Sequence, residues 1–164
     1  MQATAEWRES PQPPGRAVLV DIDGVLADAS GRQHFLNNPS GHRDWRAFFG
    51  AVGGDPPLQG VPQLLDLLDP AITIVLLSDR PKWVFEITRD WLERHGMRWH
   101  LLVLRGDDAV LGAAEFKCTV LQHLRDSGFV IELALDDDVR IVEMYRAEGC
   151  SAVYVHSGYY TGQH

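Results

Sequence analysis

The sequence predicts an α/β fold in which a mostly parallel, Rossmann-like sheet carries helices on both faces. Short apolar runs alternate along the chain with stretches whose apolar residues recur at helical spacing, which is typical of this class. Acidic and hydroxyl side chains follow several of the apolar runs. Since the carboxyl ends of parallel strands meet at one edge of such a sheet, these side chains are expected to converge there.

Five apolar runs are predicted as buried strands, at residues 17–22, 72–77, 100–104, 130–135 and 152–155. A helix is predicted over about 61–69, beginning beside Gly60 and Pro62. Three further helices are predicted from apolar residues that share one helical face: Val84, Ile87, Trp91 and Leu92; Phe116, Val120, Leu121 and Leu124; and Ile141, Val142 and Tyr145.

The 164 residues suit one domain, which we place at 17–164 after a flexible, proline-rich N-terminal arm at 1–16. The two cysteines are too few for a disulfide framework, and neither a secretory signal nor a membrane-spanning run is seen, so cytoplasmic residence is expected.

The formal net charge is −8 and no basic cluster is present, which argues against extended duplex binding. A pocket for one nucleotide or one strand end stays possible.

One long connection, at about 28–58, fits no strand pattern and is interpreted as a flap or insert near the site. It contains Arg32 and an aromatic group on a short predicted helix: Trp45, Phe48 and Phe49. These aromatic residues are expected to pack rather than to stack on bases.

Carboxylates dominate the predicted edge of the sheet. Asp21 and Asp23 lie two residues apart, so they share one side of the chain and repel each other unless a cation lies nearby. Ser78, Asp79 and Arg80 follow the second strand, and Asp136, Asp137 and Asp138 follow the fourth. Because Mg²⁺ prefers oxygen ligands, the pattern predicts a magnesium site that Asp137 or Asp136 completes.

The same residues offer what phosphate-ester hydrolysis requires, namely a nucleophile, a proton donor, a cation and donors to the phosphoryl group. Asp21 is the candidate nucleophile, forming an aspartyl-phosphate, and Asp23 is the candidate acid and base. Ser78 is expected to donate to a phosphoryl oxygen. Lys117, in the first turn of its predicted helix, is expected to neutralise charge between Asp21 and the phosphate.

The ordered set DxDGV, LLS, a helix-borne lysine and LDDD resembles the haloacid-dehalogenase superfamily of phosphohydrolases. Over residues 17–160 the chain further resembles the 3′-phosphatase domain of phage and bacterial polynucleotide kinases. The matching segments are VDIDGVLAD, SGR, RDWRAFF, LLSDRP, ITRDWLERHG, LRGDD, ALDDDVRIVEMYRAEG and SGYY.

The resemblance implies a Mg²⁺-dependent phosphatase with a minimal cap that removes phosphate from the 3′ ends of nucleic acid or from 3′-nucleotides. Position by position, the resemblance implies that Asp21 is the nucleophile and that Asp23 is the general acid and base, with its backbone carbonyl binding the metal. It implies that Asp137 is a metal ligand, with Asp136 beside it. It also implies that Ser78 and Lys117 contact the phosphate and that Arg32 and Arg80 serve the phosphate end of the substrate.

Three positions depart from the family pattern: Asp79 stands where glycine is frequent, Asp138 where arginine is common, and Ala113 where an acid precedes the lysine. No GxxxxGK[ST] motif occurs, so any 5′-kinase activity would need another chain, and a separate kinase or ligase is a candidate partner.

Two alternatives stay open. One is a 5′(3′)-nucleotidase acting on free nucleotides, which DGVLAD also resembles; the other is a non-catalytic phosphatase-fold partner of a kinase or ligase. Five intact candidate groups argue against the second: Asp21, Asp23, Ser78, Lys117 and Asp137. The choice between DNA and RNA depends on contacts to the 2′-hydroxyl, which the sequence does not reveal.

Overall fold

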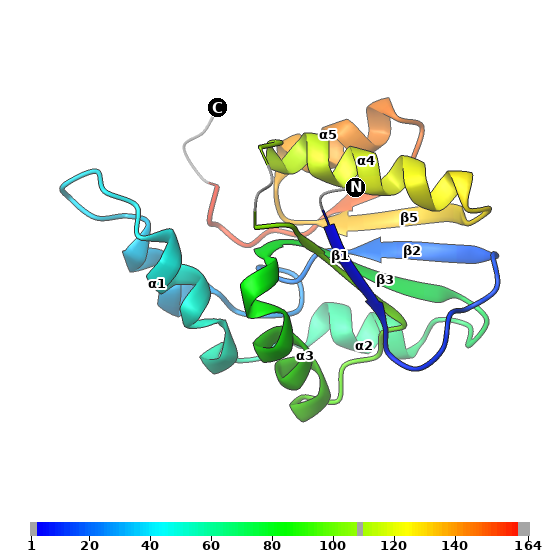
Figure 1. Cartoon of the computed structure of the whole chain (residues 1–164), viewed down its shortest axis with the longest axis horizontal. Helices are drawn as coiled ribbons and strands as arrows, with labels where there is room; N and C mark the ends of the chain where they lie inside the picture. The colour runs from blue at the N-terminus through cyan, green and yellow to red at the C-terminus, as the bar shows by residue number, and fades with distance from the viewer. Residues whose placement is uncertain (1–2, 108–109, 161–164) are drawn as a thin grey trace.

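A six-stranded sheet forms the centre of the molecule in the computed structural model, which describes residues 3–107 and 110–160 (Figure 1). The strands lie in the order β1-β4-β3-β2-β5-β6, and every pairing is parallel except that of β1 with β4. Their bounds are β1 Ala3–Trp7, β2 Arg16–Val20, β3 Thr73–Pro81, β4 Leu101–Arg105, β5 Val130–Asp136 and β6 Ala152–Tyr154.

Helices cover both faces of the sheet, which confirms the predicted α/β architecture (Figure 1). The helices α2 (Gly60–Asp66) and α3 (Phe85–Arg94) lie on one face, and α4 (Ala113–Asp126) and α5 (Val139–Ala147) lie on the other. Alternation along β2 supplies both cores, because Val18 and Val20 pack with the α2 and α3 side while Ala17 and Leu19 pack with the α4 and α5 side.

The N-terminal segment differs from the expected flexible arm. Ala3–Trp7 forms the edge strand β1, pairing antiparallel with β4 from Ala3 opposite Arg105 to Trp7 opposite Leu101. The Trp7 ring lies 6.2 Å from that of Phe129 and adds to the core beneath α4. The strand was missed because its pairing partner lies about a hundred residues further along the chain, where no local pattern can indicate it.

The strand β3 continues beyond its predicted end at Leu77 and carries Ser78, Asp79 and Arg80 within it. Its register with β4 shifts between Ser78 and Pro81, as at a β-bulge. The carboxyl ends of β3, β2 and β5 are neighbours in the sheet, so this edge gathers the polar residues that follow each of them.

The insert contains two 3₁₀ segments, η1 (Ser30–Phe35) and η2 (Val52–Gly54), and the short helix α1 (Trp45–Gly50). In Figure 1 α1 projects from the side of the molecule, away from α4 and α5. Ala27 forms bridges with both Asp23 and Pro57, so the two ends of the insert meet beside β2. Within the described ranges, no helix is both long and apolar enough to cross a membrane.

Candidate functional site

A buried lysine links carboxylates from two neighbouring strand ends. Lys117 Nζ lies 2.6 Å from Asp136 Oδ2 and 3.2 Å from Asp21 Oδ2. Because α4 begins at Ala113, Lys117 occupies the second turn of the helix rather than the first. The other oxygen of Asp136 accepts a hydrogen bond from the amide of Asp138 at 3.0 Å, so both of its oxygens are engaged.

Asp137 has a different environment. It is 1% exposed, and among the described residues neither of its carboxylate oxygens has a hydrogen-bond partner. The nearby hydroxyl of Ser157 favours the charged form of Asp137, but it does not lie in hydrogen-bond geometry with this carboxylate. Burial and the neighbouring Asp136 raise the pKa of Asp137 to about 7. An unpartnered buried carboxylate is costly, and a bound cation would remove that cost.

Asp21, Asp136 and Asp137 each offer an oxygen within 4.8 Å of the others, so these three residues fit the oxygen-ligand preference of a hard cation. Burial raises the pKa of Asp21 well above its usual range; Lys117 opposes this, while Asp136 and Asp137 add to it. Burial would lower the pKa of Lys117, but Asp136 and Asp21 outweigh it and leave this pKa well above its usual value. The cluster therefore combines a fixed ammonium with carboxylates in excess.

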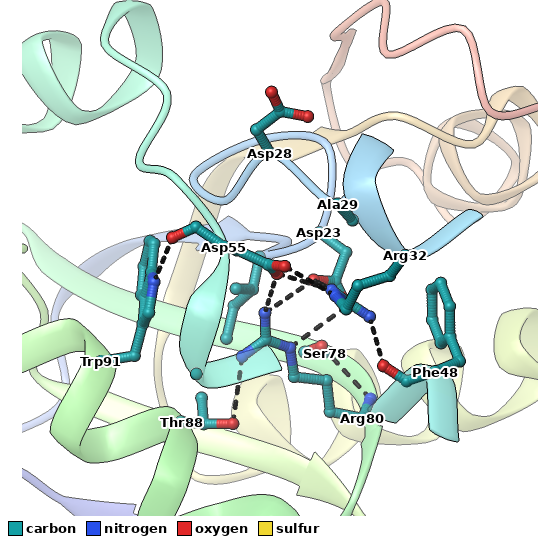
Figure 2. Close-up of polar contacts among 12 residues, drawn as sticks. Asp23, Asp28, Ala29, Arg32, Phe48, Asp55, Ser78, Arg80, Thr88 and Trp91 are labelled. Atoms are coloured by element: carbon teal, nitrogen blue, oxygen red, sulfur yellow. Dashed lines mark hydrogen bonds and ion pairs between the residues drawn. The ribbon is translucent and has the colours of Figure 1, made fainter. Parts of the chain in front are cut away.

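Asp23 lies two residues from Asp21 but is surrounded by arginines (Figure 2). Its Oδ1 accepts from Arg32 Nη2 and from Arg80 Nη2, both at 2.7 Å, and its Oδ2 accepts from Arg80 Nε at 3.2 Å. Burial alone would raise the pKa of Asp23, but Arg80 and Arg32 outweigh it and hold the pKa below its usual range. Asp23 is therefore a carboxylate in the free protein and must take up a proton before it can act as an acid.

The two arginines for which contact with substrate phosphate is expected, Arg32 and Arg80, are held by groups of the protein itself. Arg32 and Arg80 are 3% and 0% exposed, and every guanidinium nitrogen of both already donates to the protein. Besides Asp23, their partners include the carboxylate of Asp55, the carbonyl of Phe48 and the hydroxyl of Thr88 (Figure 2). Both arginines thus hold the Asp23 carboxylate, and Arg80 also belongs to the lining of the cavity.

A cavity of about 470 Å³ opens above these groups, lined by Asp21, Asp23 and Ser78 from the strand ends. Ser78 is itself 2% exposed, and its Oγ accepts from the amide of Arg80 at 3.3 Å. The aromatic part of the remaining lining consists of Trp45, Phe48 and Phe49 on α1 and of Tyr159 and Tyr160 near the C-terminal end. The charged part consists of Arg43, Asp79, Arg80, Asp138 and Arg140, and the rest is uncharged: Gln33, Leu36, Asn37 and Ala113. Phe48 is buried as expected, whereas Trp45 is 47% exposed.

Basic residues balance two of the departures noted in the sequence. Arg105 Nη1 lies 3.0 Å from Asp79 Oδ1, so the extra acid at the cavity mouth is paired. Asp138 caps α5 by accepting from the amide of Arg140, and the Arg140 guanidinium folds back onto the same carboxylate at 2.7 Å. Ala113 lies in the cavity lining, so the third departure leaves no charge there.

Several residues of the site were not identified from the sequence, above all Asp55, Arg43 and Arg140. Arg43 and Arg140 lie in the segments RDWRAFF and DDDVRIVEMYR that had been singled out, so their charge was a usable signal. Asp55 lies in VGGDPP, which reads as an ordinary turn. Its burial is decided by contacts with Arg32 and Trp91, at separations of 23 and 36 residues.

We predict that Gly24→Ala destabilises the protein. Gly24 has φ +78°, and a Cβ there would lie 2.1 Å from Asp137 Oδ2 and 2.8 Å from Ser157 Cβ. We expect the free energy of unfolding to fall by at least about 1 kcal/mol, from the left-handed conformation alone, as measured by urea denaturation. Gly60→Ala is the control, since nothing lies within 4 Å of its Cβ position, and it should leave stability equal or higher. Equal effects of the two substitutions would contradict this prediction.

Comparison with known proteins identifies the family and supports the fold. A model of the family described as "Polynucleotide kinase PNKP phosphatase domain" matches residues 15–160. A chain of the solved Pnkp1/Rnl/Hen1 RNA repair complex is 21% identical with a TM-score of 0.73, covering 93% of this chain and 46% of that one. The chain therefore spans about half the length of the solved chain it resembles. A search of curated protein sequences found no significant match.

Two further solved structures share the fold. The class C acid phosphatase from Bacillus anthracis, with tungstate bound, is 17% identical with a TM-score of 0.66, covering 91% of this chain and 69% of that one. A haloacid dehalogenase-like hydrolase from Streptococcus pneumoniae is 13% identical with a TM-score of 0.57, covering 87% of each chain. From the family match, the chain belongs to the polynucleotide kinase phosphatase-domain family, and it is a phosphatase of the haloacid-dehalogenase type, a hydrolase of phosphoric monoesters.

Proposed function

We propose that this phosphatase removes 3′-phosphate from nucleic-acid ends or 3′-nucleotides, with Asp21 as its nucleophile. The observation that carries the chemistry is the pair of carboxylates with opposite surroundings. Asp21 lines the cavity beside Lys117, and Asp23 lines it between two arginines. Two carboxylates that line one cavity two residues apart can supply one group that attacks phosphorus and a second that transfers protons.

In the proposed reaction Asp21 Oδ attacks phosphorus, the bond from phosphorus to the leaving oxygen breaks, and Asp23 donates the proton that this oxygen requires. Asp23 then accepts a proton from water, whose oxygen attacks the aspartyl-phosphate and releases inorganic phosphate. Ser78, buried in the cavity lining, donates to a phosphoryl oxygen. Lys117 holds Asp21 in place and balances the charge that gathers as the phosphate arrives.

We further propose that Mg²⁺ is the cofactor, held by Asp21 and Asp137, with Asp136 alongside and the Asp23 backbone carbonyl as a further ligand. Asp136 is committed to Lys117 and to the Asp138 amide, whereas Asp137 has no partner among the described residues, so Asp137 is the direct ligand. Five carboxylates (Asp21, Asp23, Asp55, Asp136, Asp137) against three cations (Arg32, Arg80, Lys117) leave two negative charges, which one divalent ion balances. When bound, the ion supplies charge stabilisation to the phosphoryl group.

The walls of the cavity support a nucleotide as the group that carries the phosphate. Trp45 stacks on Phe49, with ring centroids 5.8 Å apart and planes inclined by 21°, and keeps nearly half its surface exposed. Arg43 adds a positively charged side chain to the lining of the cavity, whereas the charge of Arg140 is paired with that of Asp138. The solved relative in an RNA repair complex supports action on nucleic-acid ends beside a separate kinase or ligase. DNA and RNA remain alternatives within this proposal.

The central experiment measures phosphate release from a 3′-phosphorylated oligonucleotide, a 5′-phosphorylated one and a nucleoside monophosphate, with Mg²⁺ and then with EDTA. We expect release mainly from the 3′ end, loss of activity in EDTA, and a fall of at least about 10⁴-fold in Asp21→Asn because the nucleophile is removed. Asp66→Asn, an exposed carboxylate on α2, is the control and should retain full activity. Preference for the monophosphate would favour the nucleotidase alternative, and full activity of Asp21→Asn would refute the mechanism.

Mg²⁺ binding should strengthen as pH rises through about 7, because the ion must displace the proton that burial keeps on Asp137. A raised pKa stabilises the metal-free protein at low pH, and this contribution is lost between about pH 4 and pH 7 as Asp137 ionises. Thermal unfolding at pH 5.5 and pH 8 should therefore show a small Mg²⁺-induced rise in Tm at the lower pH and a larger one at the higher. Asp137→Asn should abolish this rise at both. An equal rise at both pH values would count against Asp137 as the ligand.

Trp45→Ala should weaken binding of nucleic-acid substrates. Loss of one stacking contact removes about 1–3 kcal/mol of binding, so KM for a 3′-phosphorylated oligonucleotide should rise by roughly fivefold or more. Trp45→Phe keeps an aromatic face and should show a smaller change. Steady-state kinetics on β-glycerophosphate provide the control, since this substrate has no aromatic ring to stack. A matching rise in KM for β-glycerophosphate would mean that Trp45 only shapes the cavity.

A further inference from the structure

We propose that Asp55 is a positioning residue that fixes the orientation of the Asp23 carboxylate through the two arginines they share. The inference rests on the proposed role of Asp23 as the acid that protonates the leaving oxygen. Asp55 is a buried carboxylate of the insert, and Figure 2 shows it beside Arg32, Arg80 and Asp23.

Asp55 is itself held firmly. Its side chain is 3% exposed, its backbone carbonyl accepts from Trp91 Nε1 at 2.8 Å, and its amide donates to the carbonyl of Val52. Trp91 is fully buried on α3, so this bond anchors the insert to the body of the domain. The Asp55 carboxylate therefore provides a fixed point from which a neighbouring side chain can be oriented.

Arg32 connects that fixed point to Asp23. Its Nε and Nη2 donate to the two oxygens of Asp55 at 2.7 Å each, in the two-pronged geometry that defines the plane of the guanidinium. The same Nη2 lies 2.7 Å from Asp23 Oδ1, so one nitrogen bridges the two carboxylates. Arg32 Nη1 donates to the Phe48 carbonyl, and the guanidinium carbon lies 4.3 Å from the Phe48 ring centre.

Arg80 completes the arrangement from the opposite side. Its Nη1 donates to Thr88 Oγ1, its Nη2 lies 2.7 Å from Asp23 Oδ1, and the same Nη2 lies 3.6 Å from Asp55 Oδ2. The Nη2 atoms of both arginines thus lie between the same two carboxylates. The four groups are balanced in charge, so neither arginine is left without a counter-charge in a buried place.

The two carboxylate oxygens of Asp23 have different surroundings. Oδ1 is occupied by two short hydrogen bonds, whereas Oδ2 accepts one longer bond of 3.2 Å and belongs to a side chain that is 21% exposed at the cavity. The geometry therefore points to Oδ2 as the atom that carries the proton to the leaving oxygen. Without Asp55, Arg32 loses the partner that sets its plane, and Oδ2 loses its fixed direction.

Asp55 would be equally buried if it only neutralised the arginines and supported folding. The test therefore needs a readout that depends on proton donation by Asp23. The leaving group of p-nitrophenyl phosphate departs without a proton, whereas that of an alkyl phosphate such as β-glycerophosphate requires one. The ratio of kcat on the alkyl ester to kcat on p-nitrophenyl phosphate therefore reports the placement of the acid. Loss of folded protein lowers both rates equally and cancels in this ratio.

We expect Asp55→Asn to lower this ratio by about 10²-fold, the usual effect of a displacement of about 1 Å in a reacting group, with KM little changed. Asp55→Glu keeps the charge and should restore part of the ratio. Val52→Ala, a buried apolar change in the same segment, is the matched control and should leave the ratio unchanged. If Asp55→Asn does not fold, Asp55→Glu and Arg32→Lys test the inference instead. Both variants keep the charges but displace the contact that joins Asp55, Arg32 and Asp23, so each should lower the ratio below that of the wild type.

Asp23→Asn separates failure of this inference from failure of the proposed function. A low ratio in Asp23→Asn with a wild-type ratio in the folded Asp55 variants overturns the role of Asp55 alone. A wild-type ratio in Asp23→Asn means that Asp23 is not the acid, and the proposed mechanism fails with the inference. Equal loss on both substrates in the Asp55 variants would show that Asp55 acts only through stability.

Discussion

The repulsion among carboxylates gathered at one edge of the sheet is the constraint on which the rest of this structure depends. Parallel strands bring their carboxyl ends together, and here the ends of β2 and β5 deliver Asp21, Asp23, Asp136 and Asp137 to one small region. Charged groups that leave water are costly unless they are paired. The fold meets this cost by bringing cationic side chains from three other elements, α4, β3 and the insert.

These cations divide the carboxylates into two environments. Lys117 from α4 reaches Asp21 and Asp136, and the arginines from η1 and β3 enclose Asp23. Burial raises the pKa of Asp21 although Lys117 opposes it, whereas Arg80 and Arg32 outweigh burial at Asp23 and lower its pKa. Asp137, which has no hydrogen-bond partner among the described residues, marks the place where a bound cation would complete the balance.

The insert contributes charged groups to the surroundings of Asp23 and also forms one wall of the cavity. Arg32, Phe48 and Asp55 all belong to it, whereas Arg80, Thr88 and Trp91 belong to the body of the domain (Figure 2). The hydrogen bond from Trp91 to Asp55 and the ion pair between Arg80 and Asp55 join the insert to the body of the domain. Arg32 donates both to the Phe48 carbonyl and to Asp23, so the position of the aromatic wall and that of the Asp23 carboxylate are linked.

The sequence by itself determined the features whose signals are local. Apolar runs and helical periodicity identified the parallel strands and the main helices, because burial of one face imposes a repeat that can be read within a few residues. The i, i+2 spacing of Asp21 and Asp23 and the acids after 130–135 located the site, because strand ends converge in any fold of this class. Only the tertiary structure decided the remainder. The strand β1 needs a partner a hundred residues away, and Arg32 and Arg80 reach Asp23 from separate segments, with Asp55 bound to Arg32. The hydrogen-bond partners of Arg32 and Arg80 were also decided by the tertiary structure, since a buried guanidinium takes its position from the carboxylates around it, and those are known only once the chain has folded.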